Sequence, residues 1–335
     1  MNSIFPIHTF DRSQIRWSDY LKDLTPIEEY GGVRFKREDK FAPLGFNGVN
    51  GSKMRQCLWL VDEWVRTKNI TGIVSGSVVG SPQHPFISSI CKHYELGCLI
   101  VTGSKHYMNH TNMILAHRMG AQFKVEKIGY ARALQSKAFQ VAKKLPGHEV
   151  LETNITVDER LNPPERIEAF HKIGSYQVAN IPDDIETLII PCGSCNSVVS
   201  ILYGIAQNPP RNLKRILLMG IGNNGSYNLK YIPQRLKIIS KVIGKNLNSK
   251  FCYTMFKDKN TGIDLIHHDI NGTGFCTYGD WMPFNFGGID LHPRYEGKIW
   301  NWMKLKPEIF DKYLNEKTLF WVVGNEPREV FPIVT

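Results

Sequence analysis

Two short segments carry residue types that suit cofactor chemistry, and the first contains Lys53. It reads Asn50-Gly51-Ser52-Lys53-Met54-Arg55 and opens a run whose apolar residues repeat with helical spacing. Ser52 is a residue type that caps helices, and the helix dipole disfavours a cation in the first turn. A lysine whose charge is disfavoured is suited to nucleophilic or Schiff-base chemistry. An ordinary surface lysine would give the same local pattern.

The second segment is a turn of small polar residues between an apolar run and a helical run. It reads Gly193-Ser194-Cys195-Asn196-Ser197, and the helical run continues from Val198 to Ala206. Backbone amides at the start of a helix form a site for a phosphate. The glycine patterns of P-loops and dinucleotide folds are missing from this turn. The turn therefore fits the single phosphate of a small cofactor.

Cys192 and Cys195 form a Cys-x-x-Cys pair at the same turn. A zinc site would need a second pair at matching spacing, and a thioredoxin-like redox site would need a different order of elements. We therefore prefer the phosphate interpretation to a redox role, and we expect no metal ion. All seven cysteines are expected to be reduced.

Two further polar segments are candidates for substrate contact. The turn from Ser75 to His84 follows an apolar run and precedes a helical one, which is where ligands bind in α/β sheets. The segment from Gly287 to Lys298 includes Tyr295 and is followed by the segment Phe320 to Asn325. The candidate side chains of the first turn are Ser77, Ser81, Gln83 and His84.

Alternating strands and helices must position these segments. Short apolar runs bounded by Gly, Pro or polar residues predict buried strands. Between such runs, Met54, Cys57, Leu58, Val61 and Val65 fall on one face of a helix. The pattern predicts an α/β protein with mainly parallel sheets. The predicted strands are 70–75, 98–102, 122–125, 187–192, 215–221 and 318–323.

The positive charge of the chain is concentrated in one segment. The 335 residues include 41 Lys and Arg and 31 Asp and Glu, which gives a net charge of +10. No Asp or Glu lies between Thr187 and Lys257, where ten basic residues equal the whole excess. The segment predicts either an anionic partner such as nucleic acid or a solvated basic face. The nucleic-acid contact candidates, which share one helix face, are Lys230, Lys237, Lys241 and Lys245.

The chain has no apolar run long enough to span a membrane. Its first residues also lack the pattern of a secretory signal. We therefore expect a cytoplasmic protein with no membrane partner.

Taken in order along nearly the whole chain, these segments resemble the fold-type II pyridoxal-phosphate (PLP) enzymes. The resemblance is greatest to the branch of aminocyclopropane-carboxylate (ACC) deaminase and D-cysteine desulfhydrase. Lys36-Arg37-Glu38-Asp39 and Gly51-Ser52-Lys53-Met54-Arg55 match family motifs, with Ser52 in place of an Asn. Gly288 to Lys298 is similar to a family segment that ends in Tyr-x-Gly-Lys, and Asn112 to Ala121 to one that ends in Leu-Gly-Ala.

The resemblance implies two α/β domains with PLP in the cleft between them. Residues 1–50 and 158–335 would form the large, PLP-anchoring domain, and residues 51–157 the small domain. Lys53 would be the Schiff-base lysine and the proton shuttle at the substrate Cα. Because the family is commonly dimeric, a homodimer is expected. The residues that would bind the cofactor are Lys53, Gly193, Ser194, Cys195, Asn196, Ser197 and Asn325.

The chain departs from the family around the cofactor ring. The acid that faces the pyridine nitrogen in the deaminase branch is replaced by Gly287, and Asn325 is a candidate substitute. Two tyrosines of the family are replaced by Phe275 and Phe286. A deaminase that opens a cyclopropane ring with those groups is therefore not expected.

The resemblance implies a PLP-dependent lyase that acts at Cα or Cβ of an amino-acid group, by decarboxylation or elimination. Bacteriophages that hypermodify thymine encode PLP enzymes that act on amino-acid adducts of DNA bases. The basic segment favours such a DNA-tethered substrate, in the host cytoplasm if the chain is phage-encoded. One alternative is a deaminase or desulfhydrase of a free small amino acid. The other is a non-catalytic nucleic-acid-binding protein on a degenerate PLP fold, against which the retained Lys53 argues.

Overall fold

The chain folds into two compact units. The computed structural model describes residues 21–44, 49–103, 105–151, 162–222, 225–253, 262–277 and 279–325, with the backbone alone at 225–229. Of these described residues, those between 42 and 151 form the small unit, and those at 21–41 and between 162 and 325 form the large unit. The domain boundary predicted at residue 157 lies outside the described residues.

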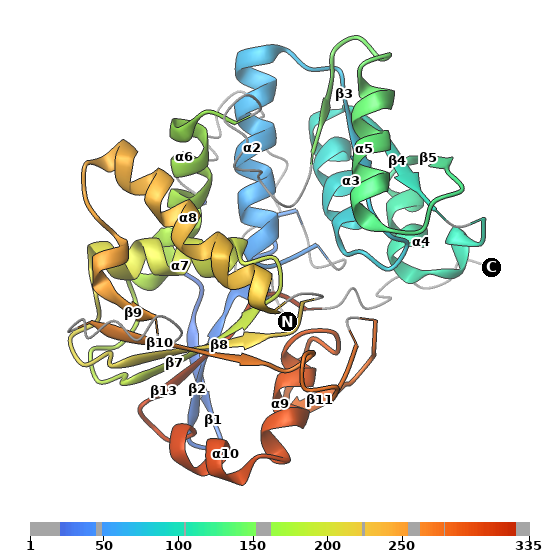
Figure 1. Cartoon of the computed structure of the whole chain (residues 1–335). Helices are drawn as coiled ribbons and strands as arrows, with labels where there is room; N and C mark the ends of the chain where they lie inside the picture. The colour runs from blue at the N-terminus through green and yellow to red at the C-terminus, as the bar shows by residue number, and fades with distance from the viewer. Residues whose placement is uncertain are drawn as a thin grey trace. The chain divides into compact units, whose positions relative to one another are not determined.

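The small unit is a parallel sheet with helices on both faces. Over its described residues the strand order is β5-β4-β3-β6, and every neighbouring pair is parallel. Helix α5 packs on one face, where Val74, Val101 and Leu134 form the core. Helices α3 and α4 connect β3 to β4 and β4 to β5, in the opposite direction across the sheet from the α5 connection between β5 and β6. Because such connections are right-handed, α3 and α4 lie on the other face. The elements, drawn in Figure 1, are α2 (Ser52–Lys68), β3 (Gly72–Gly76), α3 (Gln83–Tyr94), β4 (Gly97–Thr102), α4 (Thr111–Arg118), β5 (Gln122–Val125), α5 (Ala131–Ala142) and β6 (His148–Val150).

The large unit is built on a seven-stranded sheet, counted over the described residues. The strand order is β1-β2-β13-β7-β8-β10-β9, in which only the β1–β2 pair is antiparallel. The central strands are buried on both faces, as their continuous apolar runs predict. The strands are β1 (Ile27–Tyr30), β2 (Val33–Arg37), β7 (Thr187–Cys192), β8 (Arg215–Gly220), β9 (Phe251–Tyr253), β10 (Ile263–Asp269) and β13 (Thr318–Val322).

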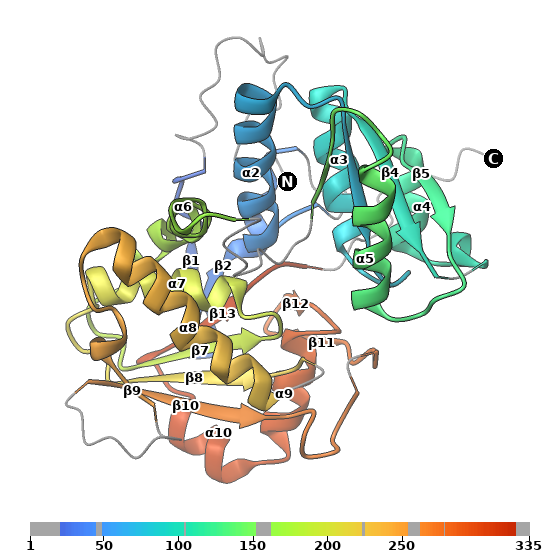
Figure 2. The same ribbon diagram turned by 45° about the horizontal axis from the view of Figure 1, so that its top comes forward.

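Helices cover both faces of this sheet. Figure 2 shows α7 (Asn196–Gln207) and α8 (Gly225–Ile243) on one side of β7, β8 and β10, and α9 (Glu296–Lys304) and α10 (Pro307–Tyr313) on the other. Helix α6 (Pro164–Ser175) packs against α7 and α8. The hairpin of β11 (Phe284–Phe286) and β12 (Ile289–Leu291) packs against α9. Of the described helices, none is both long and apolar enough to cross a membrane.

Side chains alternate between the two cores along each central strand. In β7, Leu188 and Ile190 pack with α7 and α8, whereas Ile189 points to the opposite core with Trp300 and Phe320. All six predicted strands are present, as β3, β4, β5, β7, β8 and β13. The predicted α/β fold with mainly parallel sheets is therefore confirmed.

Candidate cofactor site

Lys53 is the second residue of α2, in the small unit. The helix begins after Gly51, whose φ of 91° lies in the region that favours glycine. The Gly51 carbonyl accepts the amides of Met54 and Arg55. The prediction that Ser52 caps this helix is wrong, because Ser52 is already helical and Gly51 is the N-cap.

The Lys53 side chain lies close to Cys57, one helical turn later. Burial raises the pKa of the Cys57 thiol to about 12, and the positive charge of Lys53 opposes that rise. Cys57 is buried and Lys53 is half-buried. The amine therefore lies beside the buried face of α2.

The turn after β3, residues 76–82, is anchored by two of the predicted substrate residues. Gln83 donates from Nε2 to Ser75 Oγ at 2.5 Å. His84 is fully buried, and its Nε2 lies 2.9 Å from the Val78 carbonyl oxygen. Burial lowers the pKa of His84 to about 4, so at neutral pH the ring is uncharged and Nε2 is the donor. Both side chains hold the turn in place.

The two predicted serines lie in the same turn. Ser77 is buried, and its amide donates to the Val101 carbonyl of the neighbouring strand at 3.3 Å. Ser81 is half-buried, and its hydroxyl accepts the amide of Gln83 at 3.3 Å. Their roles in substrate contact stay predictions.

The predicted phosphate turn connects β7 to α7 in the large unit. Cys195 is the N-cap of α7 and has a φ of 63°, which is uncommon for a residue other than glycine. A Cβ at Gly193 would meet no atom within 4 Å, so the backbone of the turn is open there. Asn196 is buried, whereas Ser194 and Ser197 are half-buried. An open backbone at a helix start fits a phosphate group.

Arg235 of α8 supports this turn from within the large unit. The side chain is 5% exposed, and its Nη1 donates to the Ser194 carbonyl at 3.3 Å and to Asn196 Oδ1 at 2.9 Å. The side chain of Asn196, predicted to bind the cofactor, is therefore engaged in holding the turn. In the sequence, Arg235 is one of the ten basic residues between Thr187 and Lys257, and helical spacing alone does not reveal its burial.

Cys192 and Cys195 bring their sulfur atoms to 3.1 Å, and both are free thiols. Both thiols are buried. The hydrogen bond with Cys195 and the burial raise the pKa of the Cys192 thiol well above its usual range. Within the described residues, no group of three His, Cys, Asp or Glu side chains could hold a metal ion.

A buried carboxyl lies at the carboxyl end of the same sheet. Glu296 is the first residue of α9, is fully buried, and accepts the Val323 amide through Oε1 at 2.7 Å. Phe320 of β13 pairs with Ile189 of β7, so continuing the register places Val323 beside Cys192, where the phosphate turn begins. Glu296 is therefore close to the phosphate turn.

Burial raises the pKa of Glu296 to about 8, although the Val323 amide opposes the rise. Its Oε2 atom is buried without a hydrogen-bond partner among the described residues. Glu296 lies within the segment Gly287 to Lys298, but the burial of a carboxyl cannot be predicted from its neighbours in sequence. The adjacent Tyr295, a predicted substrate residue, is 9% exposed and its ring lies 4.2 Å from that of His292.

The residues predicted to replace family groups have structural roles. Gly287 has a φ of 56° in the tight turn between β11 and β12, a conformation that favours glycine. Phe286 packs 4.4 Å from the Trp300 ring in the core. Asn325 donates from Nδ2 to the Asp290 carbonyl at 3.2 Å. The hairpin explains Gly287 by turn geometry, without reference to a cofactor.

The four predicted nucleic-acid contacts are exposed on α8 and just after it. Its opposite side is apolar and buried through Ile232, Leu236 and Ile239, whereas the Leu229 side chain lies outside the described ones. Because β8 leads into α8, the helix begins at the carboxyl edge of the sheet, where the phosphate turn lies. The exposed lysines are Lys230, Lys237, Lys241 and Lys245.

The chain is similar to known proteins in sequence and in structure. No protein-family model matches the chain. The "O-seryl-dTMP PLP-dependent decarboxylase" of Salmonella phage ViI is 38% identical, over 97% of this chain and 87% of the relative. An ACC deaminase homologue superposes with a TM-score of 0.66 at 18% identity, over 90% of this chain and 89% of its own.

Two other solved structures share the fold at lower similarity. Processed threonine deaminase isoform 2 from Solanum lycopersicum has a TM-score of 0.55 at 15% identity, over 92% of this chain and 84% of its own. A hydrogen sulfide-producing enzyme from Fusobacterium nucleatum has a TM-score of 0.54 at 14% identity, over 94% and 97%. The fold likeness and the sequence identity to the phage protein indicate the same family. The chain belongs to the family of the phage O-seryl-dTMP PLP-dependent decarboxylase, among the fold-type II PLP enzymes.

Proposed function

We propose that this protein is a PLP-dependent lyase that removes the carboxyl group of an amino acid attached to a thymine nucleotide in DNA. The observation that carries this proposal is the 38% identity, over 97% of the chain, to the phage O-seryl-dTMP PLP-dependent decarboxylase. The basic segment between Thr187 and Lys257 supports a polyanion as the carrier of that nucleotide. Such a substrate places the enzyme in the cytoplasm, where DNA is modified.

Three features of the chain fit PLP. The turn from Gly193 to Ser197 offers an open backbone at a helix start to the phosphate. Lys53 offers an amine at the start of α2 for covalent attachment. Glu296 offers a buried carboxyl close to the phosphate turn, with Oε2 unpartnered among the described residues. When bound, PLP supplies an electron sink for the bond that breaks at Cα.

The roles of the side chains follow from these positions. Lys53 is the group that returns a proton to Cα after carbon dioxide leaves. Glu296, whose pKa is raised to about 8 by burial, carries a proton at neutral pH that it can share with the ring nitrogen of the cofactor. Glu296 takes the role predicted for Asn325, whose side-chain amide donates to the Asp290 carbonyl. The turn that contains Ser77 and Ser81 positions the amino-acid group.

The chemistry of the proposed substrate defines the test. A seryl group joined through its oxygen carries an α-carboxylate and, on Cβ, an oxygen that can leave. Decarboxylation releases carbon dioxide and keeps the ether bond, whereas elimination releases the nucleotide. The holoenzyme is incubated with O-seryl-thymidine in an oligonucleotide, with the free O-seryl nucleotide and with free serine. We expect carbon dioxide and an intact aminoethyl ether from the oligonucleotide.

Other outcomes identify the alternatives. Ammonia from free amino acids, without carbon dioxide from either nucleotide substrate, would establish a deaminase instead. If the protein is colourless and does not bind added PLP, the remaining alternative is a non-catalytic nucleic-acid-binding protein. Carbon dioxide from the free nucleotide alone would show that the enzyme is a lyase whose substrate is not part of DNA.

A further inference from the structure

A second basic segment lies in the small unit. Between Leu96 and His148 the chain has eight Lys and Arg residues and a single acid, Glu126, so this stretch carries a net charge of 8 − 1 = +7. Acidic residues elsewhere in the chain balance this positive charge, so it does not add to the total of +10. The basic residues are Lys105, Arg118, Lys124, Lys127, Arg132, Lys137, Lys143 and Lys144.

Three loops of this unit meet at one edge of its sheet. β3, β4 and β5 are parallel neighbours, so the loops that follow them leave from the same carboxyl edge. A Cβ at Gly76 would lie 2.2 Å from the Leu134 carbonyl oxygen, at the first turn of α5. A Cβ at Gly103 would lie 1.8 Å from the Ile128 carbonyl oxygen. Such contacts allow only glycine, so the end of β3 touches the first turn of α5, and the loop after β4 touches the loop after β5.

The same edge includes the turn assigned to the substrate. Asn112, at the start of α4, donates from Nδ2 to the Gly80 carbonyl at 3.0 Å. This bond joins the loop after β4 to the turn of residues 76–82. Any group bound at the carboxyl edge therefore lies beside that turn.

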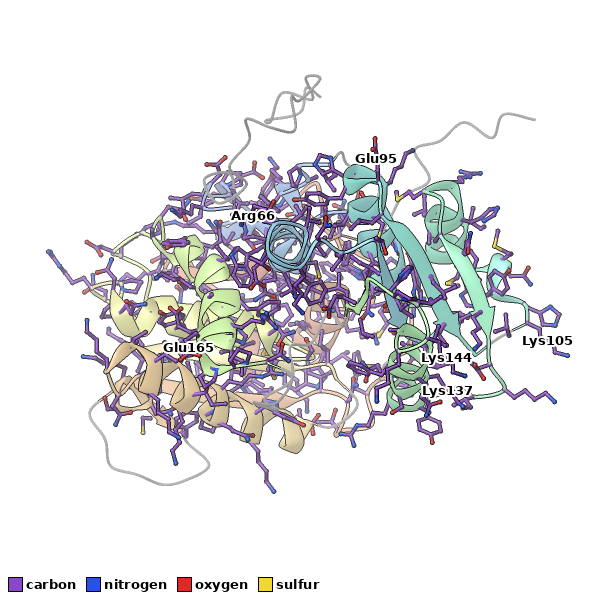
Figure 3. The ribbon with its side chains drawn as sticks, turned by 90° about the horizontal axis from the view of Figure 1, so that it is seen from above. Arg66, Glu95, Lys105, Lys137, Lys144 and Glu165 are labelled. Carbon is purple, nitrogen blue, oxygen red and sulfur yellow. The ribbon has the colours of Figure 1, made fainter. Side chains whose placement is uncertain are left out.

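One exposed aromatic side chain and two exposed lysines lie on the loops at this edge. Tyr130, the residue before α5, is 68% exposed. Lys105 and Lys127 are also exposed, and each lies within two residues of the contact between Gly103 and Ile128. Figure 3 shows Lys105 projecting at the margin of the small unit. Exposed rings that stack on bases, combined with cations that meet phosphates, are typical of surfaces that bind single-stranded nucleic acid.

We propose that this nucleotide edge, defined by Lys105, Lys127 and Tyr130, binds the single-stranded or flipped-out DNA around the modified thymine. Tyr130 stacks on a base, and the two lysines contact neighbouring phosphates. This inference rests on the proposed function, because only a DNA-tethered substrate requires such a surface. An enzyme that acts on a base must take it out of the stack, and the edge binds the strand in that unstacked form.

The test measures binding directly, without turnover. The holoenzyme is titrated with a fluorescent single-stranded thymine-rich oligonucleotide at several salt concentrations. Tyr130→Ala should weaken binding about tenfold, the usual effect of losing one stacking partner. Tyr130→Phe keeps the ring and should restore binding. The double variant Lys105→Glu, Lys127→Glu should lower the slope of log affinity against log salt by about 1.4, because two phosphate contacts are lost.

The matched control is the double variant Lys143→Glu, Lys144→Glu, which makes the same charge change in the same unit. Lys143 and Lys144 are both exposed and follow the other end of α5, at the opposite edge of the sheet. The control should leave both the affinity and the salt slope near their wild-type values. Equal losses in the control and in the Lys105→Glu, Lys127→Glu variant would show that net charge alone acts, and would overturn the proposal.

Failure of this inference differs from failure of the proposed function. If the enzyme decarboxylates the modified oligonucleotide but the edge variants bind it like the wild type, the inference fails and the function stands. If carbon dioxide is never released but binding depends on Tyr130 and the lysines, the function fails and the edge stands. A second copy of the chain is the alternative occupant of this edge, and sedimentation tests it. If Tyr130→Ala dissociates an oligomer, the edge is an interface between copies and the proposal is wrong.

Discussion

Arg235 and Asn196 form a buried hydrogen bond of 2.9 Å that ties α8 to the first residue of α7. Because Nη1 also donates to the Ser194 carbonyl, one guanidinium fixes the turn on both sides of Cys195. The charge also acts on its surroundings: burial lowers the pKa of His171 well below its usual range, and Arg235 lowers it further. A phosphate bound at the turn would therefore have a preorganised backbone and a cation behind it.

Arg235→Met should weaken PLP binding about 10- to 100-fold, the usual range for losing a hydrogen bond to a charged group. Pyridoxal, which lacks the phosphate, should bind the variant and the wild type alike. Titration of the apoprotein with both ligands gives the comparison, and Arg235→Lys should recover part of the PLP affinity. Lys237→Met, an exposed position on the same helix, is the control. Equal losses for PLP and pyridoxal would refute a role at the phosphate.

Lys53→Ala should abolish covalent attachment of PLP. Borohydride reduction of the wild-type holoenzyme should fix the cofactor to the peptide that contains Lys53, and the yellow colour should be absent from the variant. Lys92→Ala, an exposed lysine on α3, should label like the wild type. Peptide mass spectrometry reads the site, and label on a different lysine would move the assignment away from α2.

The stability of the apoprotein should depend on pH through Glu296. Its pKa is raised from 4.5 to about 8 by burial. Between these values the folded state binds more protons than the unfolded state, so the carboxyl's contribution to stability is present below pH 4.5 and is lost as pH rises through about 8. Glu296→Gln removes this titration. As pH rises across that range, the wild type should therefore lose at least about 1.4 kcal/mol of unfolding free energy relative to the variant. Urea unfolding at several pH values measures this, with Glu308→Gln, an exposed acid on α10, as the flat control.

The strands with continuous apolar runs were predictable, and most of the strands that carry charged or polar residues were not, for a physical reason. β7 and β8 are buried on both faces, so their sequences are continuous apolar runs bounded by polar residues. β1 reads Ile-Glu-Glu-Tyr at the sheet edge, and β11 and β12 have three residues each in a separate hairpin. These strands, like the internal strands β2 and β10, carry polar residues and lack that signal.

The candidate site divides in the same way. Lys53 and the phosphate turn stand in local motifs that a sequence displays directly. Glu296 and Arg235 gain their roles from partners 27 and 39 positions away in the chain. Burial is what distinguishes Arg235 from the lysines beside it, and burial is set by packing of α8 against α6 and α7.

The lysines of α8 should contribute to DNA binding in a graded way. Lys230 lies near the start of the helix, at the carboxyl edge of the sheet, and Lys241 lies about 16 Å further along. DNA whose modified base reaches the phosphate-turn edge would contact Lys230 more closely than Lys241. Lys230→Glu should therefore weaken binding of a duplex oligonucleotide more than Lys241→Glu does, and both should reduce its salt dependence. Lys250→Glu, an exposed position just before β9 at the opposite edge, is the control. Equal effects at all three positions would show a solvated basic face with no directed contact.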